Sequence, residues 1–279
     1  MSHRSGFDPA DATRERGRMS AGHGLAVSCR RVVHIYRAEA GDVVALLAGL
    51  MRPSAGVVSV GTYDMGKLTD KEISRLRGTQ IGVVVQGAVR NLLPYASLRR
   101  NILLAQRRAA RTKGVKLDEP DRVLDLVGLG GLGQHTPETL APGARQRAAL
   151  AVGIAVGPGL LLVDEPTSQL DAHGRDEVMQ ALETVNRERG TTIVVVTHDA
   201  EVGERLGRAV TIRDGRVGAE GRGGRDFAVV AGDGTVQLPP AILDKYPPGT
   251  LFTVGEGDEE VVLRPNATSG TIPSQPERA

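Results

Sequence analysis

The sequence predicts an α/β fold in which a parallel sheet is covered by helices on both faces. Short β-branched runs alternate with helical stretches from Leu25 onward, which is typical of strand–helix–strand units. The runs are almost wholly apolar, as expected for strands that are buried on both faces. Of the 279 residues, 40% are hydrophobic and 24% are charged, which excludes a disordered or collagen-like chain.

Five apolar runs are predicted strands and four amphipathic stretches are predicted helices. We expect strands over residues 57–60, 81–85, 160–163, 192–197 and 208–217. We expect helices over residues 70–77, 121–129, 144–156 and 174–190. Because such sheets bind ligands beyond the carboxyl ends of their strands, polar residues that follow the strands are the first candidates for a site.

Composition and charge exclude several classes of protein. The net charge is only +2 and aromatic residues make up 3%, so we expect neither a polyanion-coating protein nor a stacking platform for single-stranded nucleic acid. The single cysteine, Cys29, excludes an internal disulfide. The longest apolar stretch, 148–163, is shorter than the roughly 20 residues that a bilayer requires. Residues 1–24 lack the apolar core of a secretory signal, so we expect a cytoplasmic location.

The composition divides the chain into four parts. Residues 1–24 and 266–279 are polar and are expected to be disordered tails. Residues 25–220 carry the strand–helix alternation and form the main predicted domain. A Gly/Arg stretch at 221–225 is the expected linker to a small β unit over 226–265.

Polar side chains follow three of the predicted strands. Asp164 and Glu165 follow the predicted strand over 160–163. Such adjacent acids can hold Mg²⁺ and orient an attacking water. Two acids after a strand can also form an ordinary turn. His198 follows another strand and could contact a phosphate, or could be structural. Gln86 follows a third strand and could reach a metal, or could be a plain loop residue. The three positions together indicate a nucleotide site more specifically than any one of them.

The order of these motifs resembles that of the ATP-binding subunits of ABC transporters. The resemblance is carried by Gln86 after its strand and by three phrases, NLLPYASLRRNILLA (91–105), LLLVDEPTSQLD (160–171) and VVVTHD (194–199). It covers residues 25–220 and is strongest for the lipoprotein-release and macrolide-exporter type. It implies an ABC-type nucleotide-binding domain, which has a P-loop NTPase-like parallel sheet and a helical subdomain.

The resemblance also implies a role for each candidate residue. Gln86 is the Q-loop glutamine and Asp164 the Walker B aspartate, and both are expected to hold the metal. Glu165 is the expected catalytic base and His198 the switch histidine. Tyr36 is expected to stack on adenine, with simple packing as the alternative. Further contacts to the nucleotide are implied for five residues of the signature and D-loop segments: Leu140, Gly143, Gln146, Ser168 and Asp171.

The implied ligands are ATP and Mg²⁺, and the implied activity is ATP hydrolysis coupled to transport. An integral-membrane permease is expected to contact residues 87–101, and a homodimer or heterodimer with another ATP-binding subunit is expected to form the sites. The implied location is cytoplasmic, at the inner face of the cell membrane.

The Walker A loop, GxxxxGK[ST], is missing from its expected place. Residues 41–56 (GDVVALLAGLMRPSAG) resemble the preceding strand joined directly to the end of the following helix, with no loop between them. Since a strand needs about 2–6 residues before a crossover helix, we expect one element to be shortened or the segment to take one state throughout. A near-match at 61–68 has Leu68 where a metal-binding hydroxyl is required, and we interpret it as a surface turn.

The signature motif is altered as well, since Ala141 has no hydroxyl and Pro142 has no N–H to offer a phosphate. We therefore expect weak or no ATP turnover. The alternative is a non-hydrolysing pseudo-ATPase that acts as a scaffold or regulator of a permease/ATPase complex.

Residues 226–265 resemble the AbrB-type swapped-hairpin module, which dimerises and often binds DNA. The match rests on a strand, the turn Gly232-Asp233-Gly234, VQLPP, a short helix and a final hairpin. Seven acidic residues face two basic ones in this unit, so it should repel phosphate. We favour dimerisation or regulation over transcriptional control, with an inert appendage as the remaining interpretation.

Overall fold

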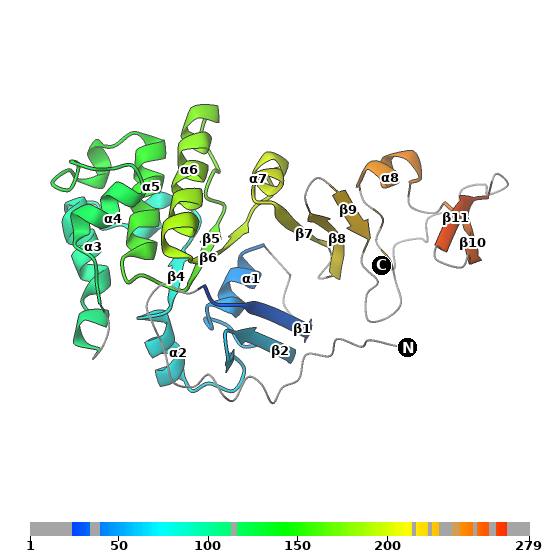
Figure 1. The fold of residues 1–279 in the computed structure, drawn as a ribbon, viewed down its shortest axis with the longest axis horizontal. Coiled ribbons are helices and arrows are strands. Elements are labelled where there is room, and N and C mark those ends of the chain that lie inside the picture. Colours follow the sequence, from blue (N-terminus) through cyan, green and yellow to red (C-terminus); the bar gives the residue numbers. More distant parts are fainter. Residues whose placement is uncertain are drawn as a thin grey trace, which may run out of the picture. The chain divides into compact units, whose positions relative to one another are not determined.

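The computed structural model of the chain describes residues 24–33, 40–112, 116–213, 216–222, 225–228, 236, 238, 240–247, 250–256 and 261–266. They belong to two compact units, Met1–Val202 and Gly203–Ala279, which are described separately (Figure 1). Within the described ranges, no helix has both the length and the hydropathy needed to cross a bilayer. Tyr36 and most of the two predicted tails lie outside these ranges.

A parallel sheet forms the centre of the first unit. Its strands are β4 (Ile81–Val84), β5 (Leu160–Asp164) and β6 (Thr192–Val196), in the order β4-β5-β6. The two pairings are parallel, with Val84 opposite Val163 and Asp164 opposite Val196. The predicted α/β fold with a parallel sheet is therefore confirmed.

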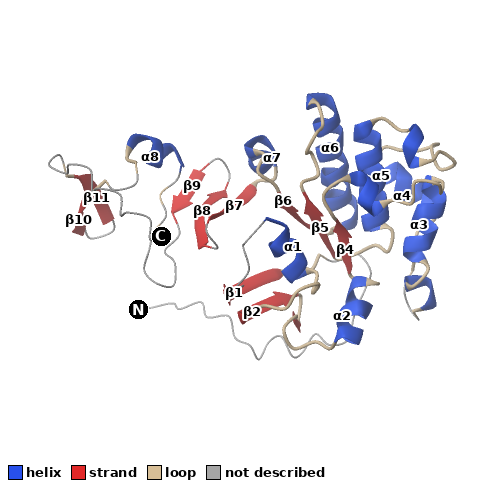
Figure 2. Cartoon of the chain, turned by 180° about the vertical axis from the view of Figure 1, so that it is seen from behind, coloured by secondary structure: helices blue, strands red, loops and turns tan. Residues whose placement is uncertain are grey.

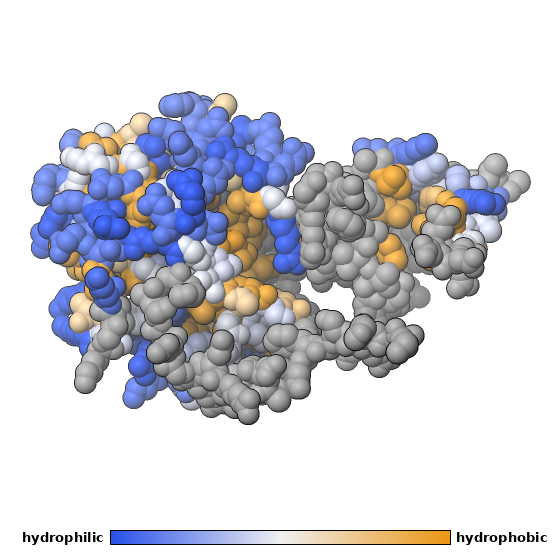
Figure 3. All heavy atoms as spheres, in the orientation of Figure 1, coloured by the Kyte–Doolittle hydropathy of each residue, from blue (hydrophilic) through white to orange (hydrophobic). Residues whose placement is uncertain are grey.

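The two outer strands of this sheet differ in how far they are covered. Within β4, only Val83 is more than slightly exposed, whereas all five residues of β6 are half-buried. Among the described residues β6 pairs with β5 alone, so its second edge has no strand beside it. An apolar area lies in the middle of Figure 3, where Figure 1 draws β6.

Two long helices, α5 (Pro142–Ile154) and α6 (Ala172–Arg189), cover one face of the parallel sheet (Figure 2). Helix α5 approaches β4 so closely that a Cβ atom on Gly82 would lie 2.1 Å from the carbonyl oxygen of Gly153. A Cβ atom on Gly153 would in turn lie 2.6 Å from Val84. Both positions therefore require glycine for this packing.

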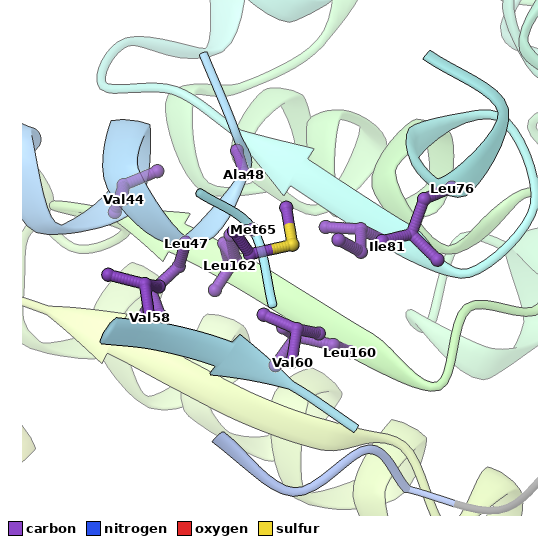
Figure 4. Close-up of a cluster of buried hydrophobic side chains, with 10 residues drawn as sticks. All are labelled: Val44, Leu47, Ala48, Val58, Val60, Met65, Leu76, Ile81, Leu160 and Leu162. Carbon is purple, nitrogen blue, oxygen red and sulfur yellow. The ribbon is translucent and has the colours of Figure 1, made fainter. Parts of the chain in front are cut away.

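The other face of the sheet packs against α1 (Ala40–Leu47) and a small antiparallel sheet. That second sheet contains β1 (Val27–Val33), β2 (Ala55–Val60) and β3 (Tyr63–Asp64). Figure 4 shows the core between the two sheets, where Leu47 of α1 lies among side chains of β2 and β5. The buried residues of this cluster are Val44, Leu47, Ala48, Val58, Val60, Met65, Leu76, Ile81, Leu160 and Leu162.

Helix α1 replaces the strand that the sequence suggested over residues 41–46. The whole segment from Ala40 to Leu47 is helical, so it takes one state throughout. A strand followed by a helix needs loop residues for the reversal, and none are available here. The helix also places Val44, Leu47 and Ala48 on one side, at i, i+3 and i+4, where they are buried in the core.

Shorter helices complete the first unit. They are α2 (Asp70–Arg77), α3 (Leu98–Gln106) and α4 (Pro120–Leu126), with 3₁₀ turns η2 (Ala88–Asn91), η3 (Ala109–Arg111) and η4 (Pro137–Thr139). Helix α2 begins at a capping box in which Thr69 and Glu72 satisfy each other's backbone N–H groups. Helices α3 and α4 pack against α5 and each other.

Residues of the second unit form short antiparallel elements. The single strand predicted over 208–217 is instead a strand pair, β7 (Arg208–Arg213) and β8 (Arg216–Arg222). The expected linker at 221–225 lies where β8 pairs with β9 (Arg225–Ala228), with Arg222 opposite Arg225. Helix α7 (Ala200–Arg205) precedes these strands, and α8 (Pro240–Lys245) precedes a hairpin of β10 (Phe252–Glu256) and β11 (Val261–Pro265).

Candidate functional site

The candidate site lies at the carboxyl edge of the parallel sheet. Asp164 is the last residue of β5, Gln86 follows β4, and His198 follows β6. Parallel pairing brings these three strand ends to the same edge. The backbone N–H of Gln86 favours the charged form of the Asp164 carboxylate and so opposes the rise in the pKa of that group, which places these two predicted residues near each other.

Glu165 and His198 form the closest side-chain pair in this site. Oε1 of Glu165 lies 2.8 Å from Nδ1 of the His198 ring and accepts the His198 backbone N–H at 3.1 Å. Oε2 accepts the hydroxyl of Thr197 at 3.2 Å. The Glu165 residue is only 8% exposed, whereas the His198 side chain is 83% exposed. The buried carboxylate is therefore held by the loop that follows β6, and the imidazole faces outward.

Two pKa values are raised in this cluster, for different reasons. The hydrogen bond to Glu165, together with its negative charge, raises the pKa of His198 because both favour the imidazolium form. Burial, and then the nearby charge of Glu165, raise the pKa of Asp164 against the opposing hydrogen bond from Gln86. The site thus concentrates negative charge, a condition that favours a bound cation.

The backbone after β5 is strained at two positions. Glu165 has φ 46° and Gln169 has φ 67°, which lie in the left-handed region that costs non-glycine residues about 1–3 kcal/mol. The carbonyl of Glu165 accepts the Ser168 hydroxyl at 3.1 Å, which holds this loop in shape. An open pocket of about 240 Å³ lies between this loop, Arg175 and residues 198–199. Its volume is below the 300–1,000 Å³ of a typical small-molecule site.

The signature segment lies at the start of α5. Leu140 and Gly143 are buried, and a Cβ atom on Gly143 would be 3.2 Å from the Cα atom of Gly174 in α6. Gln146 is 94% buried, and among the described residues its side-chain nitrogen has no hydrogen-bond partner. Asp171 caps α6 by accepting the Gly174 N–H at 2.8 Å. These residues therefore gather where α5 and α6 begin.

Sequence reasoning left two polar residues of this edge without a role. Thr197 donates to Glu165 and accepts the Asp199 N–H at 3.1 Å, so it ties the loop after β6 to the carboxylate. Asn91 accepts the Val85 N–H at 2.9 Å and donates to the carbonyls of Val85 and Gly87, so it fixes the backbone on both sides of Gln86. The only sequence signal for Thr197 was a hydroxyl residue directly before a strand-end histidine.

The residues present fit one half of a magnesium–nucleotide site. The Asp164 carboxylate and the Gln86 amide offer oxygen ligands of the kind that Mg²⁺ prefers, although the described residues contain no cluster of three His, Cys, Asp or Glu groups. The phosphate half is not provided by the near-match at 61–68. There the Gly66 N–H donates to Asp64 at 3.1 Å, and Lys67 pairs with the same carboxylate at 3.1 Å. An acid thus occupies the place that a phosphate would need.

Comparison with known proteins gives consistent matches to one family. Residues 42–168 match the family model described as ABC transporter. The chain is 37% identical over 177 residues to the lipoprotein-releasing system ATP-binding protein LolD of Anaeromyxobacter dehalogenans, a match that covers 63% of this chain and 73% of that one. It is 36% identical over 175 residues to LolD of Geobacter metallireducens, covering 63% and 77%.

A larger relative and two solved structures are also similar to this chain. The macrolide export ATP-binding/permease protein MacB of Rhodopirellula baltica is 38% identical over 179 residues, covering 63% of this chain but only 26% of MacB. The dimeric post-hydrolysis structure of the ATP-binding cassette MJ0796, bound to ADP and Pi, is 26% identical with a TM-score of 0.61, covering 72% of this chain and all of that one. The structure of cbiO1 from Clostridium perfringens is similar with a TM-score of 0.62 and covers 72% of this chain and 89% of its own. Because its sequence is only 22% identical, it supports the fold alone. This chain therefore belongs to the ABC transporter family, as an ATP-binding domain related to LolD and MacB.

Proposed function

We propose that this subunit binds a permease at the inner face of the membrane and holds MgATP only weakly. The observation that carries the proposal is the carboxyl edge of the sheet, where Glu165 contacts His198 and where parallel pairing brings Asp164 and Gln86 to the same edge. The weakness follows from the absence of a glycine-rich phosphate loop in the sequence.

Each residue at the sheet edge has a definite proposed task. Asp164 and the Gln86 amide would hold Mg²⁺, which supplies charge neutralisation for a transferred phosphoryl group when it is bound. Glu165 would orient a water and accept its proton. His198 and Thr197 hold Glu165 in place, and the exposed imidazole is free to contact a phosphate. Leu140, Gly143, Gln146, Ser168 and Asp171 would line the nucleotide from the signature and D-loop segments, and Tyr36 would stack on adenine.

The missing phosphate contacts have a large expected effect. Hydrogen bonds to a charged group contribute about 1.5–3 kcal/mol each. Losing three of them removes about 5 kcal/mol or more, which corresponds to roughly a 10³–10⁴-fold weaker affinity. Since the signature segment also lacks the hydroxyl and the N–H at 141 and 142, both halves of a site shared between two copies are affected.

The proposal is tested by measuring MgATP binding and phosphate release with four proteins. They are the unmodified chain, a graft that inserts a LolD strand and its GxxxxGK[ST] loop after Gly41 and also carries Ala141→Ser and Pro142→Gly, and Glu165→Gln in each background. We expect no turnover from the unmodified chain, and turnover from the graft that Glu165→Gln abolishes. Glu188→Gln, an exposed change on α6, is the matched control and should leave the activity of the graft intact.

Turnover by the unmodified chain that is lost with Glu165→Gln would make it an ordinary motor subunit. A graft that folds and still neither binds nor hydrolyses ATP would contradict the assignment of the sheet edge.

A second candidate function is a pseudo-ATPase that serves as a scaffold or regulator of a permease/ATPase complex. It is favoured by the retained docking segment, because residues 87–101 expose Val89 (62%) and Tyr95 (79%) to solvent. Such apolar exposure is typical of an interaction surface. If the chain is a scaffold, it should co-purify with its permease equally well with and without ATP, and Tyr95→Asp should abolish the association.

We further propose that residues 25–220 form the cassette and that 226–265 form an AbrB-like dimerisation or regulatory module. The register of β10 and β11 places Val254 opposite Leu263, and both are exposed on one apolar face. A two-stranded hairpin is marginally stable alone, so a partner for this face would stabilise it. Light scattering of the full chain should detect a dimer that Val254→Asp with Leu263→Asp converts to a monomer.

A further inference from the structure

The segment from α3 through η3 exposes arginine and leucine together. Its exposed residues are Arg100, Leu103 and Leu104 in α3, Arg107 at the C-cap of α3, and Arg111 at the end of η3. Leu103 is 47% exposed and Leu104 is 42% exposed. The opposite side of the same elements is buried against α4 and α5. We refer to these five exposed residues as the α3 stripe.

The stretch of sequence that contains the α3 stripe carries charge of one sign. The sequence contains no Asp or Glu between Glu72 and Asp118, but it contains ten Lys or Arg in that interval. Three of the arginines are used within the fold: Arg77 donates to the carbonyl of Gly49 at 3.3 Å, Arg99 pairs with Asp121 at 2.6 Å and Arg108 donates to Ser74 at 2.6 Å. Over the part of the chain that the structure describes, the three stripe arginines have no carboxylate partner within 4 Å. Their charge therefore faces solvent uncompensated.

The chemistry of the stripe selects its partner. Exposed leucines between unpaired arginines match an interface in which apolar groups lie beneath negative charge, as in a leaflet of anionic lipids. Long arginine side chains can reach headgroups while their methylene groups cover apolar surface.

We propose that the α3 stripe binds anionic phospholipid headgroups at the membrane surface. The stripe shares Arg100 with the 87–101 segment that is proposed to dock on the permease, and its other four residues follow that segment, so lipid and protein contacts would orient the subunit together. Its biological meaning rests on the proposed membrane role. The lipid contact itself requires neither ATP nor a permease, and it is therefore tested separately from that role.

The test is flotation of the full chain with vesicles. Vesicles containing 30% phosphatidylglycerol are compared with pure phosphatidylcholine vesicles at low and high NaCl. We expect binding only to the anionic vesicles and a loss of binding at high salt, because exposed charges are screened. Arg100→Glu with Arg107→Glu and Arg111→Glu should weaken binding by about a hundredfold or more, since each basic residue near such a surface contributes about 1 kcal/mol.

Two further variants distinguish an effect of the stripe on vesicle binding from an effect of net charge or of misfolding. Lys67→Glu with Lys71→Glu and Arg187→Glu makes the same change in net charge on other exposed positions and should keep the affinity within about threefold. Leu103→Ser with Leu104→Ser keeps the charge and should weaken binding about tenfold or more. Circular dichroism melts establish that each variant is folded.

Three results would overturn the proposal. They are equal binding to neutral vesicles, an equal loss of binding in the matched charge control, or unchanged binding in the arginine variant. Tighter association with polyglutamate than with anionic vesicles would instead assign the stripe to an acidic protein.

Discussion

The ring nitrogen Nδ1 of His198 lies 2.8 Å from Oε1 of Glu165, which joins the ends of β5 and β6 through one buried carboxylate. Because Glu165 also accepts the Thr197 hydroxyl and the His198 N–H, its position depends on the loop after β6 as much as on its own strained backbone. A substitution in the loop after β5 should therefore alter the conformation of the loop after β6, and the reverse should also hold.

The first prediction concerns the titration of His198. Its pKa is raised by Glu165, so Glu165→Gln should lower it toward the usual value of about 6.5. The stabilisation that this pair provides is complete below the unfolded pKa and is lost as pH rises through the raised folded pKa. A ¹⁵N NMR titration of the histidine rings measures the shift. An unchanged pKa of His198 in the Glu165→Gln variant would contradict the pairing.

The second prediction concerns Thr197 as a support for Glu165. Thr197→Val removes the hydroxyl that donates to the carboxylate and accepts the Asp199 N–H, and we expect a loss of about 1–2 kcal/mol in unfolding free energy. Thr197→Ser keeps the hydroxyl and should recover most of that loss. Urea unfolding followed by circular dichroism compares the two, and equal destabilisation by both variants would argue against the hydrogen bonds.

The third prediction concerns the contact between α5 and β4. Gly82→Ala places a Cβ atom 2.1 Å from a backbone oxygen, which must shift, so we expect a loss of about 3 kcal/mol. Gly203→Ala is the matched control, because its nearest neighbour would be 3.8 Å away and it lies within α7. There alanine should be neutral or stabilise the protein by about 0.5–1 kcal/mol. Similar unfolding midpoints for the two variants would refute the tight contact.

The fourth prediction concerns Asn101, a buried asparagine in α3. Its side chain accepts the Leu93 N–H at 2.7 Å and donates to the carbonyls of Leu93, Ala96 and Ser97. Asn101→Ala leaves these backbone groups unpaired and should cost about 2–4 kcal/mol. Hydrogen exchange at Leu93 should accelerate more than exchange in α6, whereas uniform acceleration would indicate global destabilisation only.

The sheet edge could be predicted because its signals are local. Apolar runs that end in Asp164, in Thr197 and His198, or near Gln86 define both the strands and the polar groups at their ends. The contact between Thr197 and Glu165 could not be predicted, since only the pairing of β5 with β6 brings them together. The roles assigned to the site residues remain predictions.

The segment over residues 40–47 takes one state throughout, which is one of the two outcomes expected from the missing loop. Residues 41–46 are rich in Val and Leu, which suit either a strand or a buried helix, and packing against β5 selects the helix. The pairing of β8 with β9, where the sequence predicts a linker, is not signalled because its glycines and arginines lack apolar alternation. In that region the strands are specified by pairing rather than by side-chain pattern.

The uncovered edge of β6 has a practical consequence for anyone handling this protein. Its row of backbone donors and acceptors is a template onto which another extended chain can add, and the sequence there is Thr-Ile-Val-Val-Val with no charge or proline to discourage it. Concentrated samples should therefore self-associate through sheet extension. A strand grafted to pair with β6 should improve solubility even if it restores no catalytic activity.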